Sequence, residues 1–254
     1  MVHKLKEVEG RKVMSSLKIE NLSKSFVGLT AVNRVTFEVQ EGGILGLIGP
    51  NGSGKTTIFN LISGFLSPDT GSIHLGAENL VGLKPHQICK RGIGRTFQIV
   101  KPFSNLSVMR NVRTAVFNRE KEISAANHQS ESLLEFVGLW SKRNEPANTL
   151  TIAERKRLEL ARSLATDPKF LLLDEVMAGL TPVEQHQMVA LIEKIKERGI
   201  TLVVIEHTMR IIMTISNRIL VLCFGEIIAH GAPQDIAQDP KVIKSYLGER
   251  YSFA

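Results

Sequence analysis

Residues 49–57 read GPNGSGKTT and fit the pattern of a phosphate-binding loop, in which Gly49 and four residues precede Gly54, Lys55 and Thr56. The stretch lies between an apolar run at 44–48, which we predict to be a buried strand, and a predicted helix at 55–62. Glycines let the backbone turn its amides toward a phosphate group, and the helix N-terminus favours the same anion. This context predicts a nucleotide site on an α/β core.

The loop gives a specific set of expected contacts. We expect Lys55 to reach the β- and γ-phosphates of ATP and to assist catalysis, and the Thr56 hydroxyl to ligate Mg²⁺. The residues expected to bind the nucleotide in this loop are Gly49, Pro50, Asn51, Gly52, Ser53, Gly54, Lys55, Thr56 and Thr57.

A second stretch, FLLLDE at 170–175, adds two carboxylates. Its apolar residues predict a buried strand, and Asp174 and Glu175 come at its carboxyl end, where ligands bind in open α/β sheets. We expect Asp174 to hold Mg²⁺ through water and Glu175 to orient and polarise the attacking water.

The rest of the chain alternates strand-like and helix-like segments, which predicts a mainly parallel sheet covered by helices. Residues 16–39 have strand character and predict an antiparallel β part. Apolar residues at helical spacing from 99 to 166 predict an inserted helical subdomain, so the α/β core would comprise 16–98 and 167–254. Further predicted elements are strands at 73–75 and 201–205, helices from 182 to about 198 and at 240–247, and a hairpin around Gly225.

Composition excludes several classes of protein. The 254 residues are 43% hydrophobic, as in ordinary globular proteins, and no apolar run approaches the ~18 residues of a membrane-spanning helix. The net charge of +7 suits a polyanionic partner without choosing among nucleotide, membrane surface and nucleic acid. Residues 1–15 are charged and lack a secretory apolar segment, so we expect a flexible extension, with Met14 as an alternative start. Cys89 and Cys223 are expected to be reduced thiols.

Beyond these motifs, residues 17–246 resemble the ABC ATPases, a family of P-loop proteins. The resemblance implies that Phe26 stacks on adenine. Gln98, in GRTFQ, resembles the glutamine that contacts Mg²⁺ or the lytic water beside the membrane subunit. His207, in VVIEHT, resembles the histidine that contacts the γ-phosphate, and residues 178–180 occupy the loop that crosses the dimer interface.

A closer resemblance is to the ATP-binding subunits of branched-chain amino acid importers, on the stretches GRTFQ, RLELARSLATDPKFLLLDEVMAGLTP, IEHTMRIIMTISNRILVL and PKVIKSYLGE. It implies integral membrane permease subunits and a second ATP-binding subunit as partners, an extracytoplasmic solute-binding protein acting indirectly, and no nucleic acid. The expected location is peripheral, on the cytoplasmic face of the membrane. Importers of urea or other amides share the pattern, so the cargo stays open. A soluble ABC protein and a small-molecule kinase are the rival interpretations.

The family's signature loop, LSGGQ, is altered here to LTIAE at 150–154. Both glycines are replaced, and Thr151 and Glu154 have the spacing of a helix-capping box. We therefore expect this chain to contribute one weakened half of an ATP-binding dimer, which favours a heterodimer and leaves a homodimer open. Val176 replaces the usual proline with little expected effect, because Thr181, Pro182 and Glu184 predict another well-capped helix.

The basic residues at 155–162 follow the altered loop. Such a run on a helix is expected to be a solvated face, with contact to phosphate or lipid as the alternative.

Overall fold

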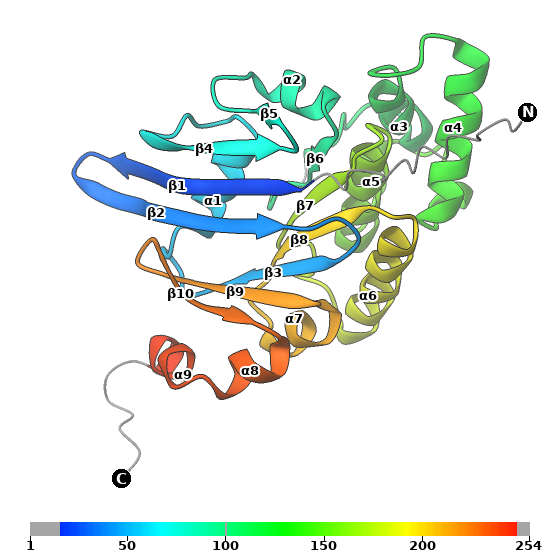
Figure 1. Cartoon of the computed structure of the whole chain (residues 1–254). Helices are drawn as coiled ribbons and strands as arrows, with labels where there is room; N and C mark the ends of the chain where they lie inside the picture. The colour runs from blue at the N-terminus through cyan, green and yellow to red at the C-terminus, as the bar shows by residue number, and fades with distance from the viewer. Residues whose placement is uncertain (1–15, 100, 248–254) are drawn as a thin grey trace, which may run out of the picture.

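The computed structural model describes residues 16–99 and 101–247 (Figure 1). The predicted extension at 1–15 and the last residues of the PKVIKSYLGE stretch lie outside the described residues.

The larger sheet has six strands in the order β10-β9-β3-β8-β7-β6. Five of them run parallel, and β10 pairs antiparallel with β9 as the hairpin predicted around Gly225. All five residues of β3, β7 and β8 are buried, which explains their continuous apolar sequences. The bounds are β3 Ile44–Ile48, β6 Ile93–Arg95, β7 Phe170–Asp174, β8 Thr201–Ile205, β9 Arg218–Cys223 and β10 Glu226–Gly231.

The smaller sheet is antiparallel, in the order β2-β1-β4-β5. It confirms the predicted antiparallel part and extends it, because β1 also pairs with the later strand β4. The bounds are β1 Leu17–Phe26, β2 Leu29–Val39, β4 Thr70–Leu75 and β5 Glu78–Asn79.

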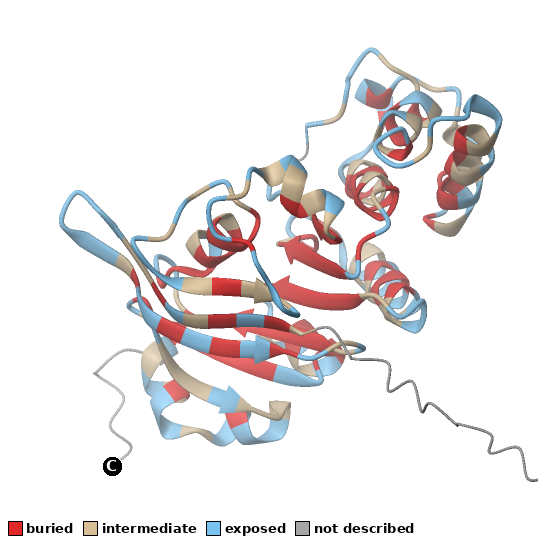
Figure 2. Cartoon of the chain, turned by 45° about the horizontal axis from the view of Figure 1, so that its top comes forward, coloured by how far each residue is buried: buried red, intermediate tan, exposed pale blue. Residues whose placement is uncertain are grey.

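The two faces of the larger sheet contribute to two separate hydrophobic clusters. Residues of β3 alternate between the two clusters. Leu45 and Leu47 pack with the antiparallel sheet and with helix α1 (Lys55–Ile62). Ile44 and Ile48 pack with the helices on the other face. Figure 2 shows buried residues along the strands of the larger sheet. Helix α1 is therefore held in position between the two sheets, with Ile58, Phe59 and Ile62 fully buried.

The remaining helices cover the other face and the ends of the sheet. Within the predicted helical stretch lie α3 (Val108–Val116), α4 (Ile123–Phe136) and α5 (Ile152–Leu164), which pack on one another beside the sheet (Figure 1). The others are α2 (Pro85–Lys90), α6 (Pro182–Glu197), α7 (Met209–Ile215), α8 (Pro233–Gln238) and α9 (Pro240–Leu247). Helices α2, α7 and α8 and strands β5 and β6 were not predicted. None of the helices in the described ranges has the length and apolar character needed to cross a bilayer.

This topology brings the predicted motifs to one edge. Strands β3, β8 and β7 are neighbours and parallel, so their carboxyl ends meet. The glycine-rich loop follows β3, the two carboxylates end β7, and His207 follows β8.

Candidate functional site

The glycine-rich loop has a backbone that only glycine accommodates at two of its positions. Gly49 and Gly54 have φ values of 148° and 105°. A methyl group on Gly49 would lie 1.9 Å from the carbonyl oxygen of Leu222, and one on Gly54 would lie 2.3 Å from that of Ala31. Gly54 is also the N-cap of α1 and supplies no side-chain cap. The first amides of the helix therefore remain available to an anion.

Lys55 lies buried within the loop. Its Nζ donates to the carbonyl oxygens of Gly49 at 2.8 Å and Pro50 at 2.9 Å. Burial lowers the pKa of the ammonium group, against the opposing charges of Glu175 and Asp174. The cation is thus held at the centre of the loop by carbonyl groups and faces the two carboxylates that end β7.

Glu175 is the point where three predicted catalytic residues meet. Its Oε2 accepts a hydrogen bond from Nε2 of Gln98 at 2.8 Å, and its Oε1 lies 2.6 Å from Nε2 of His207. The backbone of Glu175 is left-handed, with φ of 51°, an unusual conformation for a residue other than glycine. The side chain is therefore aimed by its own strained turn and by two neighbours from different loops.

Asp174 is almost fully buried and forms an ion pair that the sequence did not predict. Its Oδ2 lies 3.0 Å from Nη2 of Arg95, while its Oδ1 is buried and has no hydrogen-bond partner among the described residues. Burial raises the pKa of the Asp174 carboxyl, and the Arg95 guanidinium opposes that rise.

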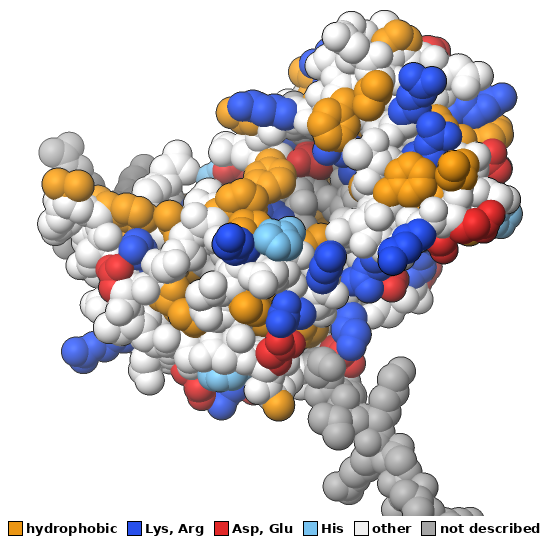
Figure 3. All heavy atoms as spheres, turned by 90° about the horizontal axis from the view of Figure 1, so that it is seen from above, with side chains coloured by type: hydrophobic (Ala, Val, Ile, Leu, Met, Phe, Trp, Pro, Cys, Tyr) orange, Lys and Arg blue, Asp and Glu red, His pale blue; other side chains and the backbone are white. Residues whose placement is uncertain are grey.

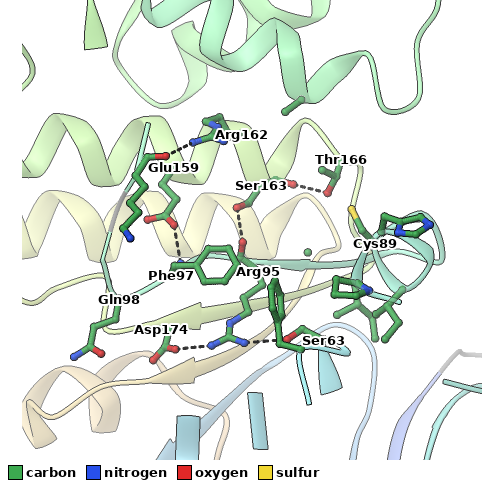
Figure 4. Close-up of a pocket in the computed structure, with 18 of the residues that line it drawn as sticks. Ser63, Cys89, Arg95, Phe97, Gln98, Glu159, Arg162, Ser163, Thr166 and Asp174 are labelled. Atoms are coloured by element: carbon green, nitrogen blue, oxygen red, sulfur yellow. Dashed lines mark hydrogen bonds and ion pairs between the residues drawn. The ribbon is translucent and has the colours of Figure 1, made fainter. Parts of the chain in front are cut away.

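The three predicted metal ligands line one cavity of about 780 Å³. Figure 4 shows two of them, Gln98 and Asp174. Thr56, Gln98 and Asp174 offer a hydroxyl, an amide and a carboxylate, and such hard oxygen donors suit Mg²⁺. The Asp174 Oδ1, buried without a partner, is the kind of atom that a metal-bound water would satisfy. The residues therefore fit the metal that the sequence implied.

The same cavity opens onto an apolar surface. Phe65, Phe97 and Ile99 line it and are exposed, and Figure 3 shows hydrophobic and basic side chains together on the face seen from above. The Phe65 and Phe97 rings pack edge to face, with 5.5 Å between their centroids.

Phe26 lies at the end of β1, where its ring is 40% exposed and Lys24 Nζ is 5.7 Å from its centroid. The neighbouring strand β2 contributes Ala31, whose carbonyl oxygen closely approaches Gly54. Phe26 is therefore available for stacking on a strand pair that touches the loop.

The altered loop at 150–154 forms the capping box that was predicted. Glu154 N–H donates to Thr151 Oγ1 at 3.3 Å, and Thr151 N–H donates to Glu154 Oε2 at 2.9 Å. The ion pair between Glu154 and Lys142, 3.4 Å apart, is an addition that the sequence did not predict. It offsets part of the negative charge that Glu154 places at the start of α5. The second predicted capping box, of Thr181 and Glu184 at the start of α6, is also confirmed.

The expectation of a solvated basic face at 155–162 is wrong. Lys156 is buried, and its Nζ donates to the carbonyl oxygen of Glu175 at 2.7 Å. Arg162 lies over the Phe103 ring and donates to the carbonyl oxygen of Lys101. Helix α5 turns these cations inward because it packs against β6 and the carboxylates of the site.

Sequence reasoning also missed Arg95 and Glu206. The Glu206 carboxylate is buried and accepts the N–H of Met177 at 2.8 Å, which fixes the turn after Glu175. Desolvation raises its pKa to about 7. Arg95 stands in GRTFQ, three positions before Gln98, and Glu206 stands in VVIEHT, directly before His207. A charged residue near each identified motif residue was therefore the available signal.

Comparison with known proteins agrees with this geometry. A family model described as ABC transporter matches residues 32–178, and one described as Branched-chain amino acid ATP-binding cassette transporter matches residues 226–252. The chain is 39% identical over 251 residues to the high-affinity branched-chain amino acid transport ATP-binding protein BraF of Pseudomonas aeruginosa, covering 92% of this chain and 98% of that protein. It is 40% identical over 249 residues to LivG of Escherichia coli K12, a protein with the same descriptive name, with the same two coverages.

Solved structures give the same result. A nucleotide-free ATP-binding cassette from an ABC transporter superposes with a TM-score of 0.85 at 30% identity, covering 93% of this chain and all of that one. The ADP conformation of the cassette MJ1267 superposes with a TM-score of 0.83 at 30% identity and the same coverage. The chain therefore belongs to the ABC transporter family, among its ATP-binding cassettes.

Proposed function

We propose that the chain is the ATP-hydrolysing subunit of an importer for branched-chain amino acids or related amino acids and amides. The observation that carries the proposal is the convergence of Gln98 and His207 on Glu175, at the sheet edge where the glycine-rich loop begins α1. The printed names of the relatives supply the cargo class.

The proposed reaction is in-line attack of water on the γ-phosphate of ATP. Glu175 would orient and polarise that water, with its carboxylate held between His207 and Gln98. Lys55 would exchange its loop carbonyl partners for β- and γ-phosphate oxygens. Mg²⁺, held by Thr56, Gln98 and water on Asp174, would supply charge neutralisation at the phosphate oxygens. Phe26 would stack on the adenine.

The exposed surfaces support the proposed partners. The apolar cavity beside Gln98 offers a docking site for an integral membrane permease subunit, which would place the chain on the cytoplasmic face of the membrane. An extracytoplasmic solute-binding protein would act through the permease alone. If the chain divides, as we propose, into an α/β core at 16–98 and 167–254 and a helical subdomain at 99–166, residues of both parts line this cavity.

A second ATP-binding subunit would complete the site. The Thr151 hydroxyl and the Thr151 and Glu154 amides already bond within their own capping box, so they are less available to a phosphate on a partner. This arrangement favours a heterodimer whose other subunit carries the better signature loop.

Gentle affinity purification of the tagged chain from native membranes, followed by mass spectrometry, tests the proposal. We expect co-purification of two multi-spanning membrane proteins and a second ATPase. Recovery of the chain alone from the soluble fraction, or with ribosomes or DNA, would contradict the transporter assignment and favour a soluble ABC ATPase.

A further inference from the structure

Arg95, the last residue of β6, makes its side-chain hydrogen bonds through its two terminal nitrogens, while its Nε is buried without a hydrogen-bond partner among the described residues (Figure 4). Its Nη2 donates to Asp174 Oδ2 at 3.0 Å. Its Nη1 donates to Asn60 Oδ1 at 2.7 Å and to Ser63 Oγ at 2.9 Å, both on or just beyond α1. One planar guanidinium thus bridges β7 and the helix that begins with Lys55.

Three aromatic rings surround the same guanidinium. The centroids of Phe97, Phe59 and Phe65 lie 5.1, 5.6 and 5.8 Å from Arg95 Cζ. The side chain is only 7% exposed, and its backbone carbonyl accepts a hydrogen bond from Ser163 on α5 at 3.0 Å. The rings and the hydrogen bonds of its terminal nitrogens therefore hold the guanidinium in place, and the Ser163 hydrogen bond holds the backbone of Arg95.

A contribution to folding stability does not by itself explain the buried ion pair between Arg95 and Asp174. A buried ion pair is often no more stabilising than apolar residues of similar volume, because both charges must be desolvated. The contact between Arg95 and Asp174 is explained better by its effect on the orientation of the Asp174 carboxylate. Arg95 bonds to one carboxylate oxygen, while Oδ1 is buried, has no partner among the residues that the structure describes, and lies beside the cavity shared with Thr56 and Gln98.

We propose that Arg95 is a positioning residue for Mg²⁺: it orients the Asp174 carboxylate so that one oxygen stays free for a metal-bound water. Through Asn60 and Ser63 it also holds α1, and with it Thr56, at a fixed spacing from β7. A lysine could supply the charge but not these parallel contacts, since only the guanidinium presents several donors in one plane. The inference rests on the proposed Mg²⁺ site.

The test measures metal binding rather than turnover. The protein is saturated with a fluorescent ADP analogue in EDTA, and the magnesium concentration giving half of the fluorescence change is then determined. Arg95→Gln should raise that midpoint about tenfold, the scale typical of groups that orient metal ligands. Arg95→Lys should recover part of the loss. Affinity for the analogue in EDTA should change much less than the magnesium midpoint, because no residue of the glycine-rich loop is replaced.

Arg162→Gln is the matched control. This arginine lines the same cavity and also lies over an aromatic ring, 5.0 Å from the Phe103 centroid, but it donates to the Lys101 carbonyl. Its magnesium midpoint should equal that of the unaltered protein.

An unchanged midpoint in Arg95→Gln would overturn the proposal, and so would an equal loss of analogue affinity with and without magnesium, which indicates a structural role only. If Arg95→Gln does not fold, Arg95→Lys decides the matter, because a midpoint equal to that of the unaltered protein would show that the planar contacts are not needed. A protein without any response to magnesium would instead refute the metal site itself.

Discussion

Replacing Glu206 by glutamine should change the stability of the protein in a way that depends on pH. The Glu206 carboxyl is buried, accepts the N–H of Met177 at 2.8 Å, and has a pKa raised by desolvation from 4.5 to about 7. Between these two values the folded state keeps a proton that the unfolded state has lost. Stability conferred by this group therefore falls as pH rises from 4.5 to about 7 and stays low above that.

The size of the effect follows from the two pKa values. One pH unit corresponds to about 1.4 kcal/mol, so ionising Glu206 in the folded protein costs about 3 kcal/mol above pH 7. Glutamine has nearly the same shape, retains an oxygen that can accept the Met177 N–H, and carries no charge. Glu206→Gln should therefore gain stability relative to the unaltered protein as pH rises.

Urea unfolding of both proteins at pH 5, 6, 7 and 8 measures this difference directly. We expect the difference between their free energies of unfolding to change in favour of Glu206→Gln by about 3 kcal/mol between pH 5 and pH 7, and to stay nearly constant from pH 7 to pH 8. Glu206→Ala is the control, because it removes the charge and the acceptor together. It should be less stable than Glu206→Gln at every pH by about 1–3 kcal/mol, the cost of an unpaired buried N–H. A difference between Glu206→Gln and the unaltered protein that does not vary with pH would refute the reasoning.

Three further changes test the site. Lys55→Ala should abolish tight ATP binding in an equilibrium titration, and unchanged affinity would contradict the role of the loop. Phe26→Ala should weaken ATP binding about tenfold by removing a stacking surface, with calorimetry as the measurement; an unaltered dissociation constant would exclude stacking. Ile152→Gly combined with Ala153→Gly should raise the ATPase activity of the assembled complex while destabilising α5 by about 2 kcal/mol; unchanged activity would show that the altered loop is not limiting.

The parts of the fold that depend on local pattern were predicted closely. Strand Ile44–Ile48, helix Lys55–Ile62 and strand Thr201–Ile205 have the predicted bounds, because a buried strand is continuously apolar and a glycine-rich loop marks where a helix begins. Helix Pro85–Lys90 and strand Ile93–Arg95 are too short to show a period. The strand exists because it pairs with β7, a partner that lies far along the chain.

The residues of the candidate site also fall into those that the sequence identified and those that it did not. Motif residues such as Glu175 were identified because a short stretch of sequence carries their pattern. Arg95 and Lys156 were not, because their roles arise from contacts with residues 79 and 19 positions away. The run at 155–162 looked like a solvated face, since sequence alone does not show which side of a charged helix meets a buried carbonyl group.

The central claim is that this site binds ATP and that Glu175 drives its hydrolysis. The most direct measurement compares Glu175→Gln with the unaltered chain, both in the complex purified from membranes, for ATP retention and for phosphate release. Glu175→Gln should retain ATP and release phosphate at least about 100-fold more slowly than the unaltered chain. Phosphate release at the unaltered rate would contradict the role of Glu175, and a Glu175→Gln complex that retains no ATP would contradict the claim that this site binds ATP.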